Sequence, residues 1–397
     1  MTSSHASRAL PWALIGAACL GSFAATSSGT TRAPFLLEMA RDLDVSMPLV
    51  ANLVSMTATA WGITSAVGGY LSDLIGRRLL IIVALLALAL AMCAQANAAN
   101  FLSVAISASA GGGCAGAFMG VVFAEVSARV PDSQRGRALG WVMSGQSLTL
   151  VLGVPLAAWV GSMIGWRGWN LCVAALALAA SLSLALTVEP TERSSKGTST
   201  RRPALHRVLS ARVLALLGTG ITERICYGLA AIYFATFLQA VYHLSLADIA
   251  IPLAVFALGN VLGTIVGGQL ADRLRDRLLT FAIAIVLSGV AALGLFMWHP
   301  SPAISLALGF LYVMLNALGR PSYMASLASV PDDVRGMVMG LNGTSASLGW
   351  ICAAGLGAVM ISIVGFEGFG PLAALLGFLG GIGAFLCRHM TRAASNL

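Results

Sequence analysis

Four charged side chains lie inside long apolar stretches of this sequence: Glu223, Arg224, Arg320 and Arg32. A charge near the centre of a lipid bilayer costs about 2.5–3.5 kcal/mol on insertion scales. If these stretches cross a membrane, the four side chains must face a wet cavity or pair with one another. They are therefore the first candidates for chemistry in the chain.

Glu223 is the only acid well inside any apolar stretch, which makes it the best candidate for a proton carrier. Its protonation would change whether Arg224 or Arg320 is free to bind a substrate. The alternative is a permanent ion pair between Glu223 and one of these arginines that only packs the helices. We favour the first interpretation because a fixed buried ion pair is a weak source of stability.

Uncharged polar residues continue this pattern at helical spacing. Tyr312, Asn316, Arg320 and Tyr323 follow i, i+4, i+8, i+11 spacing, which places them on one helix face. The predicted substrate-binding residues are Thr26, Arg32, Glu223, Arg224, Tyr227, Tyr312, Asn316, Arg320 and Tyr323. Three arginines against one acid favour an anionic or zwitterionic substrate over a lipophilic cation, unless Arg32 snorkels to the outer interface.

The composition indicates what positions these residues. Of 397 residues, 58% are hydrophobic and 10% are charged, whereas soluble domains carry about 25% charged residues. A helix needs roughly 20 mostly apolar residues to cross a bilayer. Twelve runs meet this length: 10–37, 49–71, 79–98, 101–127, 137–163, 168–188, 210–238, 247–271, 278–298, 302–327, 337–364 and 368–388.

The basic residues predict the orientation of these spans. With a cytoplasmic N-terminus, 18 of the 23 Lys and Arg residues fall in inside segments and only Arg41 and Arg167 fall outside. This satisfies the positive-inside rule, so the net charge of +8 indicates topology and not nucleic-acid binding. We expect the first run to be a retained span and not a cleaved signal peptide, because it has a counterpart in the second half of the chain.

An internal repeat divides the chain into halves. Residues 69–73 (GYLSD) recur 199 residues later as GQLAD, and residues 131–136 recur 200 residues later as PDDVRG. The match predicts two parallel six-helix halves. We expect bundles at 1–188 and 208–397, joined by a polar cytoplasmic linker at 189–207.

Residues 69–78 (GYLSDLIGRR) resemble the loop between spans 2 and 3 of the major facilitator superfamily. Gly145, Gly153 and Pro155 in the fifth run resemble the antiporter motif of its twelve-span drug:proton antiporter and arabinose-efflux-like permease branch. Two departures matter: Val154 replaces the usual Gly before the proline, and Ala108 stands where the branch has an Arg used in proton coupling.

The resemblance implies an all-α polytopic membrane protein with twelve transmembrane helices in two pseudo-symmetric six-helix bundles. It implies a secondary active transporter working by alternating access, and proton-coupled efflux of a drug-like, sugar-like or organic metabolite. Proton-coupled or exchange uptake of a small organic anion is the alternative. We expect a monomer in the bacterial inner membrane, with both termini cytoplasmic and the proton gradient as its energy source.

The loop motif also predicts a conformational latch. Asp73 would cap the start of the run at 337–364, and Arg77 or Arg78 would reach Glu125. The alternative is a solvated tight turn. The predicted gating residues are Gly69, Asp73, Gly76, Arg77, Arg78, Glu125 and, in the second copy, Asp272, Arg273 and Arg277.

Other function classes lack their signatures in this sequence. There is no G-x-x-x-x-G-K-[ST] phosphate loop, no H-E-x-x-H and no metal-ligand cluster, and all five histidines fall at ends or in loops. We therefore expect neither an enzyme nor a cofactor, and no metal. Nothing indicates the pore ring or filter of a channel.

Overall fold

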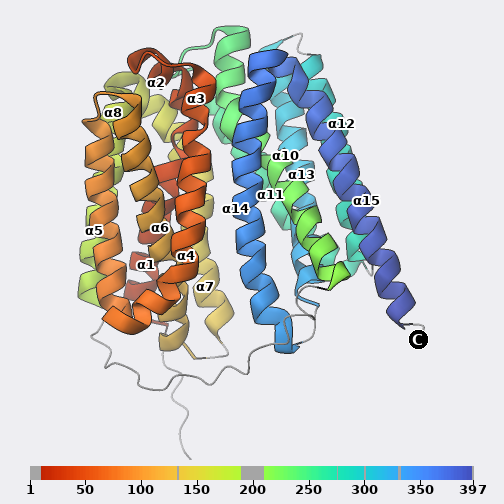
Figure 1. The fold of residues 1–397 in the computed structure, drawn as a ribbon, viewed down its shortest axis with the longest axis horizontal. Coiled ribbons are helices and arrows are strands. Elements are labelled where there is room, and N and C mark those ends of the chain that lie inside the picture. The colour runs from red at the N-terminus through yellow and green to blue at the C-terminus, as the bar shows by residue number, and fades with distance from the viewer. Residues whose placement is uncertain are drawn as a thin grey trace, which may run out of the picture. The chain divides into compact units, whose positions relative to one another are not determined.

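The computed structural model describes residues 10–131, 134–188, 210–274, 276–298, 301–329 and 332–395. Nearly all of these residues are helical, and no β-strand occurs among them (Figure 1). This follows from the apolar runs, because in lipid each backbone N–H and C=O must be satisfied within the chain, which helices do.

The helices of the first half follow the predicted runs closely. In chain order they are α1 (Trp12–Thr30), η1 (Ala33–Phe35), α2 (Leu36–Asp42), α3 (Met47–Ala51), α4 (Leu53–Ile75), α5 (Arg77–Ala96), α6 (Phe101–Arg129), α7 (Arg135–Leu148), the π-helical turn η3 (Thr149–Gly153) and α8 (Val154–Thr187).

The second half has fewer short elements. Its helices are α10 (Ala211–Tyr242), α11 (Ala250–Arg273), α12 (Arg277–Met297), α13 (Pro302–Leu327), α14 (Asp332–Ile363), η4 (Phe366–Gly368) and α15 (Phe369–Ser395).

Nine helical stretches of the described residues are long and apolar enough to cross a membrane. One of them, Arg135–Thr187, has 53 residues, about 80 Å at 1.5 Å per residue, which is far more than one crossing needs. It is broken at Gly165, whose φ of 70° and ψ of 173° are not helical, so it forms two spans. With α1 and α4, which fall on two predicted runs, the described residues contain the twelve predicted spans.

The first predicted run ends earlier than expected. α1 stops at Thr30, and the chain continues through the short elements η1 and α2. Pro34 lies in the first turn of η1, and a proline disfavours helix in the residue before it. Arg32, which we expected within the first span, therefore lies beyond the end of α1.

The chain folds into two compact units. The first comprises Met1–Thr31, Ala60–Gly153 and Ile164–Gly197, and the second comprises Arg32–Thr59, Val154–Met163 and Thr198–Leu397. The division into bundles at 1–188 and 208–397 stays a prediction, and the linker at 189–207 lies outside the described residues.

In the first unit, small residues let helices approach closely. A Cβ at Gly116 of α6 would lie 2.5 Å from the carbonyl oxygen of Trp61 on α4, and a Cβ at Gly145 of α7 would lie 2.2 Å from that of Cys19 on α1. Neither space admits a larger residue. This is the packing expected of membrane helices, where close contact stabilises association.

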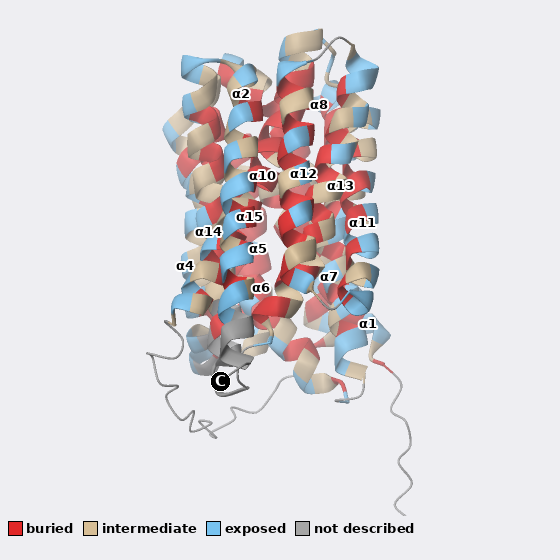
Figure 2. Cartoon of the chain, turned by 90° about the vertical axis from the view of Figure 1, so that its right-hand side faces the viewer, coloured by how far each residue is buried: buried red, intermediate tan, exposed pale blue. Residues whose placement is uncertain are grey.

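The second unit has a buried core near the start of α10. Leu216 of α10, Phe281 of α12, Tyr323 of α13 and Cys387 of α15 belong to one cluster of buried side chains. Much of α15 is exposed (Figure 2). Its exposed residues include the apolar Phe378 and Ile382. Such a surface suits contact with lipid, while the core cluster fixes α10 and α13, the two helices that carry the predicted site.

Candidate functional site

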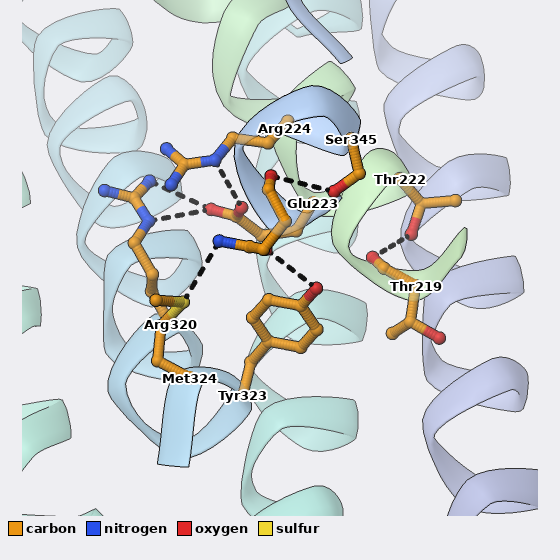
Figure 3. Close-up of polar contacts among 9 residues, drawn as sticks. Thr219, Thr222, Glu223, Arg224, Arg320, Tyr323, Met324 and Ser345 are labelled. Carbon is orange, nitrogen blue, oxygen red and sulfur yellow. Dashed lines mark hydrogen bonds and ion pairs between the residues drawn. The ribbon is translucent and has the colours of Figure 1, made fainter. Parts of the chain in front are cut away.

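Glu223 of α10 lies between two arginines in the second unit (Figure 3). Arg320 of α13 donates from Nε at 3.0 Å and from Nη2 at 2.9 Å, both to Oε1 of Glu223. Arg224 Nε lies 3.5 Å from the other oxygen, Oε2. The Glu223 side chain is 2% exposed, against 18% for Arg320 and 24% for Arg224. With both arginines charged and the acid ionised, the cluster carries a net charge of +1.

Two close approaches of helices set this geometry. A Cβ at Gly220 of α10 would lie 2.2 Å from the hydroxyl oxygen of Tyr323 on α13, and a Cβ at Gly309 would lie 2.9 Å from the ring of Phe234. The contacts run in opposite order along the two helices, so α10 and α13 pack antiparallel. Glycine at these positions lets the helices pack closely enough for Arg320 to reach Glu223.

Arg224 depends on a third glycine. A Cβ at Gly349 of α14 would lie 2.3 Å from the Cβ of Arg224. Because both atoms are fixed by backbone, a larger residue at position 349 would push α14 away from α10. The absence of a side chain there leaves room for Arg224 beside Glu223.

The polar stripe of α13 meets α10 and α14. The hydroxyl of Tyr312 donates to the backbone carbonyl of Cys226 on α10. The hydroxyl of Tyr323 donates to Oδ1 of Asn342 on α14 at 3.1 Å. Asn316, between them, is buried, and neither polar atom of its side chain has a hydrogen-bond partner. The structure thus brings the predicted stripe together with Glu223.

The Arg320 guanidinium lies over the ring of Tyr227. The central carbon of the guanidinium lies 4.8 Å from the centre of the Tyr227 ring, within the range of a cation–π contact. Trp350 of α14 packs edge-on against the same ring at 5.8 Å. Arg320 is therefore held by a carboxylate and by an aromatic face.

Two predicted site residues lie elsewhere. Arg32 is buried in the second unit, where its Nη1 donates to Oγ1 of Thr57 at 3.2 Å. Thr26 belongs to α1 in the first unit, and its hydroxyl is buried without a hydrogen-bond partner.

The predicted gating residues of the first copy form other contacts. Glu125 pairs with Arg129 at 2.5 Å, one helical turn along α6. Arg78 Nη2 donates to the carbonyl of Ala185 at 2.9 Å. Position 69 and the side chain of Asp73 lie outside the described residues, and the latch stays a prediction.

Gly76 makes the turn between α4 and α5. Its φ of +91° lies in a region that favours glycine. In the second copy, Asp272 and Arg273 are exposed, and Arg277 Nε donates to the carbonyl of Ala271 at 3.1 Å.

An ion pair that the sequence analysis missed lies near the second copy. Asp276, the residue before α12, accepts a hydrogen bond from Leu279 N at 3.2 Å and pairs with Arg388 of α15 at 2.5 Å. The acceptor role could have been predicted, because Asp is a favoured residue at a helix start. The choice of Arg388 depends on how α12 packs on α15, which spacing along the chain does not reveal.

The predicted antiporter motif surrounds the π-helical turn η3. Pro155 has no backbone N–H to donate, which interrupts the helical ladder next to this turn. Gly145 precedes the turn and Gly153 is its last residue, and both lie against α1, where a Cβ at Gly153 would be 3.5 Å from Ser27 Oγ. The motif residues therefore lie where the helix changes from α-helical to π-helical, at a place that packs against α1.

Comparison with known proteins identifies the family. The model of the Major Facilitator Superfamily matches residues 18–251 and 216–396. This chain belongs to the major facilitator superfamily. It is an integral membrane transporter and not an enzyme.

Two similar proteins come from bacteria. The chain is 27% identical over 351 residues to a chloramphenicol resistance protein of Streptomyces lividans, covering 83% of this chain and 89% of that protein. It is 32% identical over 187 residues to a chloramphenicol efflux pump of Mycobacterium tuberculosis, covering 46% of this chain and 45% of the pump.

A solved structure supports the fold. The bacterial homologue of the human lysosomal transporter Spinster, in an inward-facing and unoccupied conformation, superposes with a TM-score of 0.78 at 14% identity, covering 96% of this chain and 98% of that one. The predicted all-α fold of this superfamily is thereby confirmed.

Proposed function

We propose that this transporter exports a small drug-like, sugar-like or other organic metabolite in exchange for protons. It acts as a monomer in the bacterial inner membrane with both termini in the cytoplasm. The names of its chloramphenicol resistance and efflux relatives support the outward direction, and the distribution of basic residues supports the orientation.

The burial of Glu223 between two arginines carries this proposal. Glu223 lies well inside α10, with its side chain 2% exposed and both carboxylate oxygens near a guanidinium. Charges inside a membrane span are expensive and usually mark an ion or substrate pathway. An ion pair that only packed the helices would give no advantage in stability, because apolar residues of similar volume stabilise a protein at least as well as a buried ion pair does.

The geometry gives Glu223 two unequal oxygens. Oε1 accepts both hydrogen bonds from Arg320, whereas Oε2 has only Arg224 at 3.5 Å. A proton bound at Oε2 would replace the weaker contact and free Arg224, while Arg320 keeps its place. The cluster would change from a net charge of +1 to +2.

Such a change couples protons to transport only if the substrate binds the two forms differently. Arg224, more exposed than its partners, is the group whose engagement changes. A substrate that binds better while Arg224 is paired with the ionised Glu223 would leave on the outer side as protons enter the cluster. This is the order of events that export driven by an inward proton gradient requires.

The experiment is transport in proteoliposomes under an imposed pH gradient, with wild type compared to Glu223→Gln. Chloramphenicol serves as the probe. We expect wild-type uptake into inside-out vesicles to rise with internal acidity and Glu223→Gln to lose that dependence. A Glu223→Gln variant that keeps the full pH dependence would show that Glu223 is not the carrier.

Asp276→Asn provides the matched control. It also removes a carboxylate from an arginine ion pair, with Arg388 at 2.5 Å, but at the start of α12 and not in the middle of a span. The pH dependence of transport should survive in Asp276→Asn. Its loss in both variants would indicate a general effect of breaking an ion pair.

Uptake of a small organic anion is a second candidate. The net charge of +1 in the Glu223 cluster favours it, as does the buried Arg32. Counterflow with labelled organic anions separates the two candidates. Exchange of anions without exchange of chloramphenicol would favour uptake.

A further inference from the structure

Two asparagine side chains of the second unit are buried with unpartnered polar atoms. Asn316 of α13 is 2% exposed, and neither its Nδ2 nor its Oδ1 has a hydrogen-bond partner among the described residues. Asn260 of α11 is buried as well, and its Nδ2 has no partner. Buried polar groups in proteins nearly always have a partner, and each one without costs free energy. Packing gives no reason to keep these amides.

Asn316 faces α10 beside the charge cluster. It lies one helical turn from Tyr312 and one turn from Arg320 on the same face of α13. Tyr312 donates to the carbonyl of Cys226, and Arg320 donates to Glu223. Both acceptors belong to α10. The amide of Asn316 therefore lies opposite the neighbourhood of Tyr227, whose ring contacts Arg320.

Asn260 lies on a different helix, α11. It lies one turn after Phe256, whose ring stacks on Phe234 of α10 at 4.9 Å. Gly259 and Gly263 bring this part of α11 against α13, since a Cβ at either would lie within 2.8 Å of the carbonyl oxygen of Phe310 or Met314. This register puts Asn260 between one and two helical turns from the level of Asn316, so the two amides lie along one junction, that of α11 with α13.

The charged groups next to this junction already have partners. Both oxygens of Glu223 lie near an arginine, so a substrate carboxylate would have to displace the acid, and an ammonium group would meet two guanidinium groups. A carboxamide both donates and accepts hydrogen bonds. The polar atoms that remain suit an uncharged group that does the same.

We propose that Asn316 and Asn260 bind an uncharged amide or hydroxyl group of the exported molecule. This inference rests on the proposed export function and names its substrate class: neutral, amphipathic molecules that carry amides or hydroxyls. Glu223 and its arginines then respond to protons, while the two carboxamides recognise the substrate.

The test compares three labelled probes in proteoliposomes holding the full chain. Chloramphenicol is uncharged and carries an amide and hydroxyl groups, tetraphenylphosphonium is a lipophilic cation, and benzoate is an organic anion. We expect wild type to transport chloramphenicol. Asn316→Leu should raise its half-saturation concentration roughly tenfold, the effect of losing one good hydrogen bond, and Asn260→Leu should raise it several-fold.

Gln95→Leu is the matched control. Gln95 of α5 is a fully buried carboxamide whose two polar atoms also have no partner, but it belongs to the first unit. The half-saturation concentration for chloramphenicol should not change in this variant. Thermal unfolding without ligand checks the fold: because Asn316 has no hydrogen bond to lose, Asn316→Leu should unfold at or above the wild-type temperature.

The outcomes are distinguishable. Chloramphenicol transport with an unchanged half-saturation concentration in both Asn variants would overturn the inference, and so would transport of the ions alone by wild type, which leaves export itself standing. A large fall in the unfolding temperature of Asn316→Leu would also overturn it, by assigning the amide a structural role. Transport of none of the probes would contradict the proposed function and the inference with it.

Discussion

Arg320 donates two hydrogen bonds to a single oxygen of Glu223, from Nε at 3.0 Å and Nη2 at 2.9 Å. This leaves the other oxygen to Arg224 alone, at 3.5 Å. The acid is thus fixed on one side and open to exchange on the other. A proton can be bound at Oε2 without breaking the link between α10 and α13.

The effects of replacing Glu223 and Arg320 on the free energy of unfolding should depend strongly on each other. Arg320→Met strips the buried carboxylate of its main partner and should lower the free energy of unfolding by about 3–5 kcal/mol. Adding Glu223→Met should recover most of that loss, because the uncompensated charge is gone. Chemical unfolding of the purified protein in detergent measures both values, and equal stability of the single and double variants would contradict the coupling.

The spacing of α10 and α14 should depend on Gly349. Gly349→Ala places a Cβ 2.3 Å from the Cβ of Arg224, so the helices must separate and Arg224 must shift. We expect transport to fall at least several-fold while membrane insertion is retained. Gly343→Ala is the control on the same helix, since nothing lies within 4 Å of a Cβ there. Equal transport by the two variants would exclude this role for Gly349.

The packing of α7 on α1 allows a similar test in the first unit. Gly145→Ala places a Cβ 2.2 Å from the carbonyl oxygen of Cys19, whereas Gly140→Ala on the same helix meets nothing within 4 Å. The first should lower both the unfolding temperature and the transport rate, and the second should change neither. Thermal unfolding followed by transport in proteoliposomes checks this, and a silent Gly145→Ala would contradict the close packing.

Helical periodicity predicted much of this fold and part of the site. The twelve spans follow from the length of the apolar runs, and the stripe from Tyr312 to Tyr323 follows from i, i+4 spacing. The juxtaposition of Glu223 with Arg320 was predictable too, because two opposite charges inside apolar spans have strong reason to pair.

The sequence did not predict which residues of different helices contact one another. Asn260 stands alone among apolar neighbours, so nothing in the sequence indicates that it shares a junction with Asn316. The sequence did not indicate that the carbonyl of Ala185 would accept a hydrogen bond from Arg78, and the contact of Arg77 or Arg78 with Glu125 stays a prediction. Spacing reports which residues share a face, and only tertiary packing decides what that face meets.

The central claim is that Glu223 binds the proton that the substrate displaces, and proton release on substrate binding tests it most directly. Purified protein in weakly buffered detergent solution, with a pH-indicator dye, receives saturating chloramphenicol. Wild type should release protons as it binds, and Glu223→Gln should bind with no release. Release from Glu223→Gln equal to that from wild type would contradict the account.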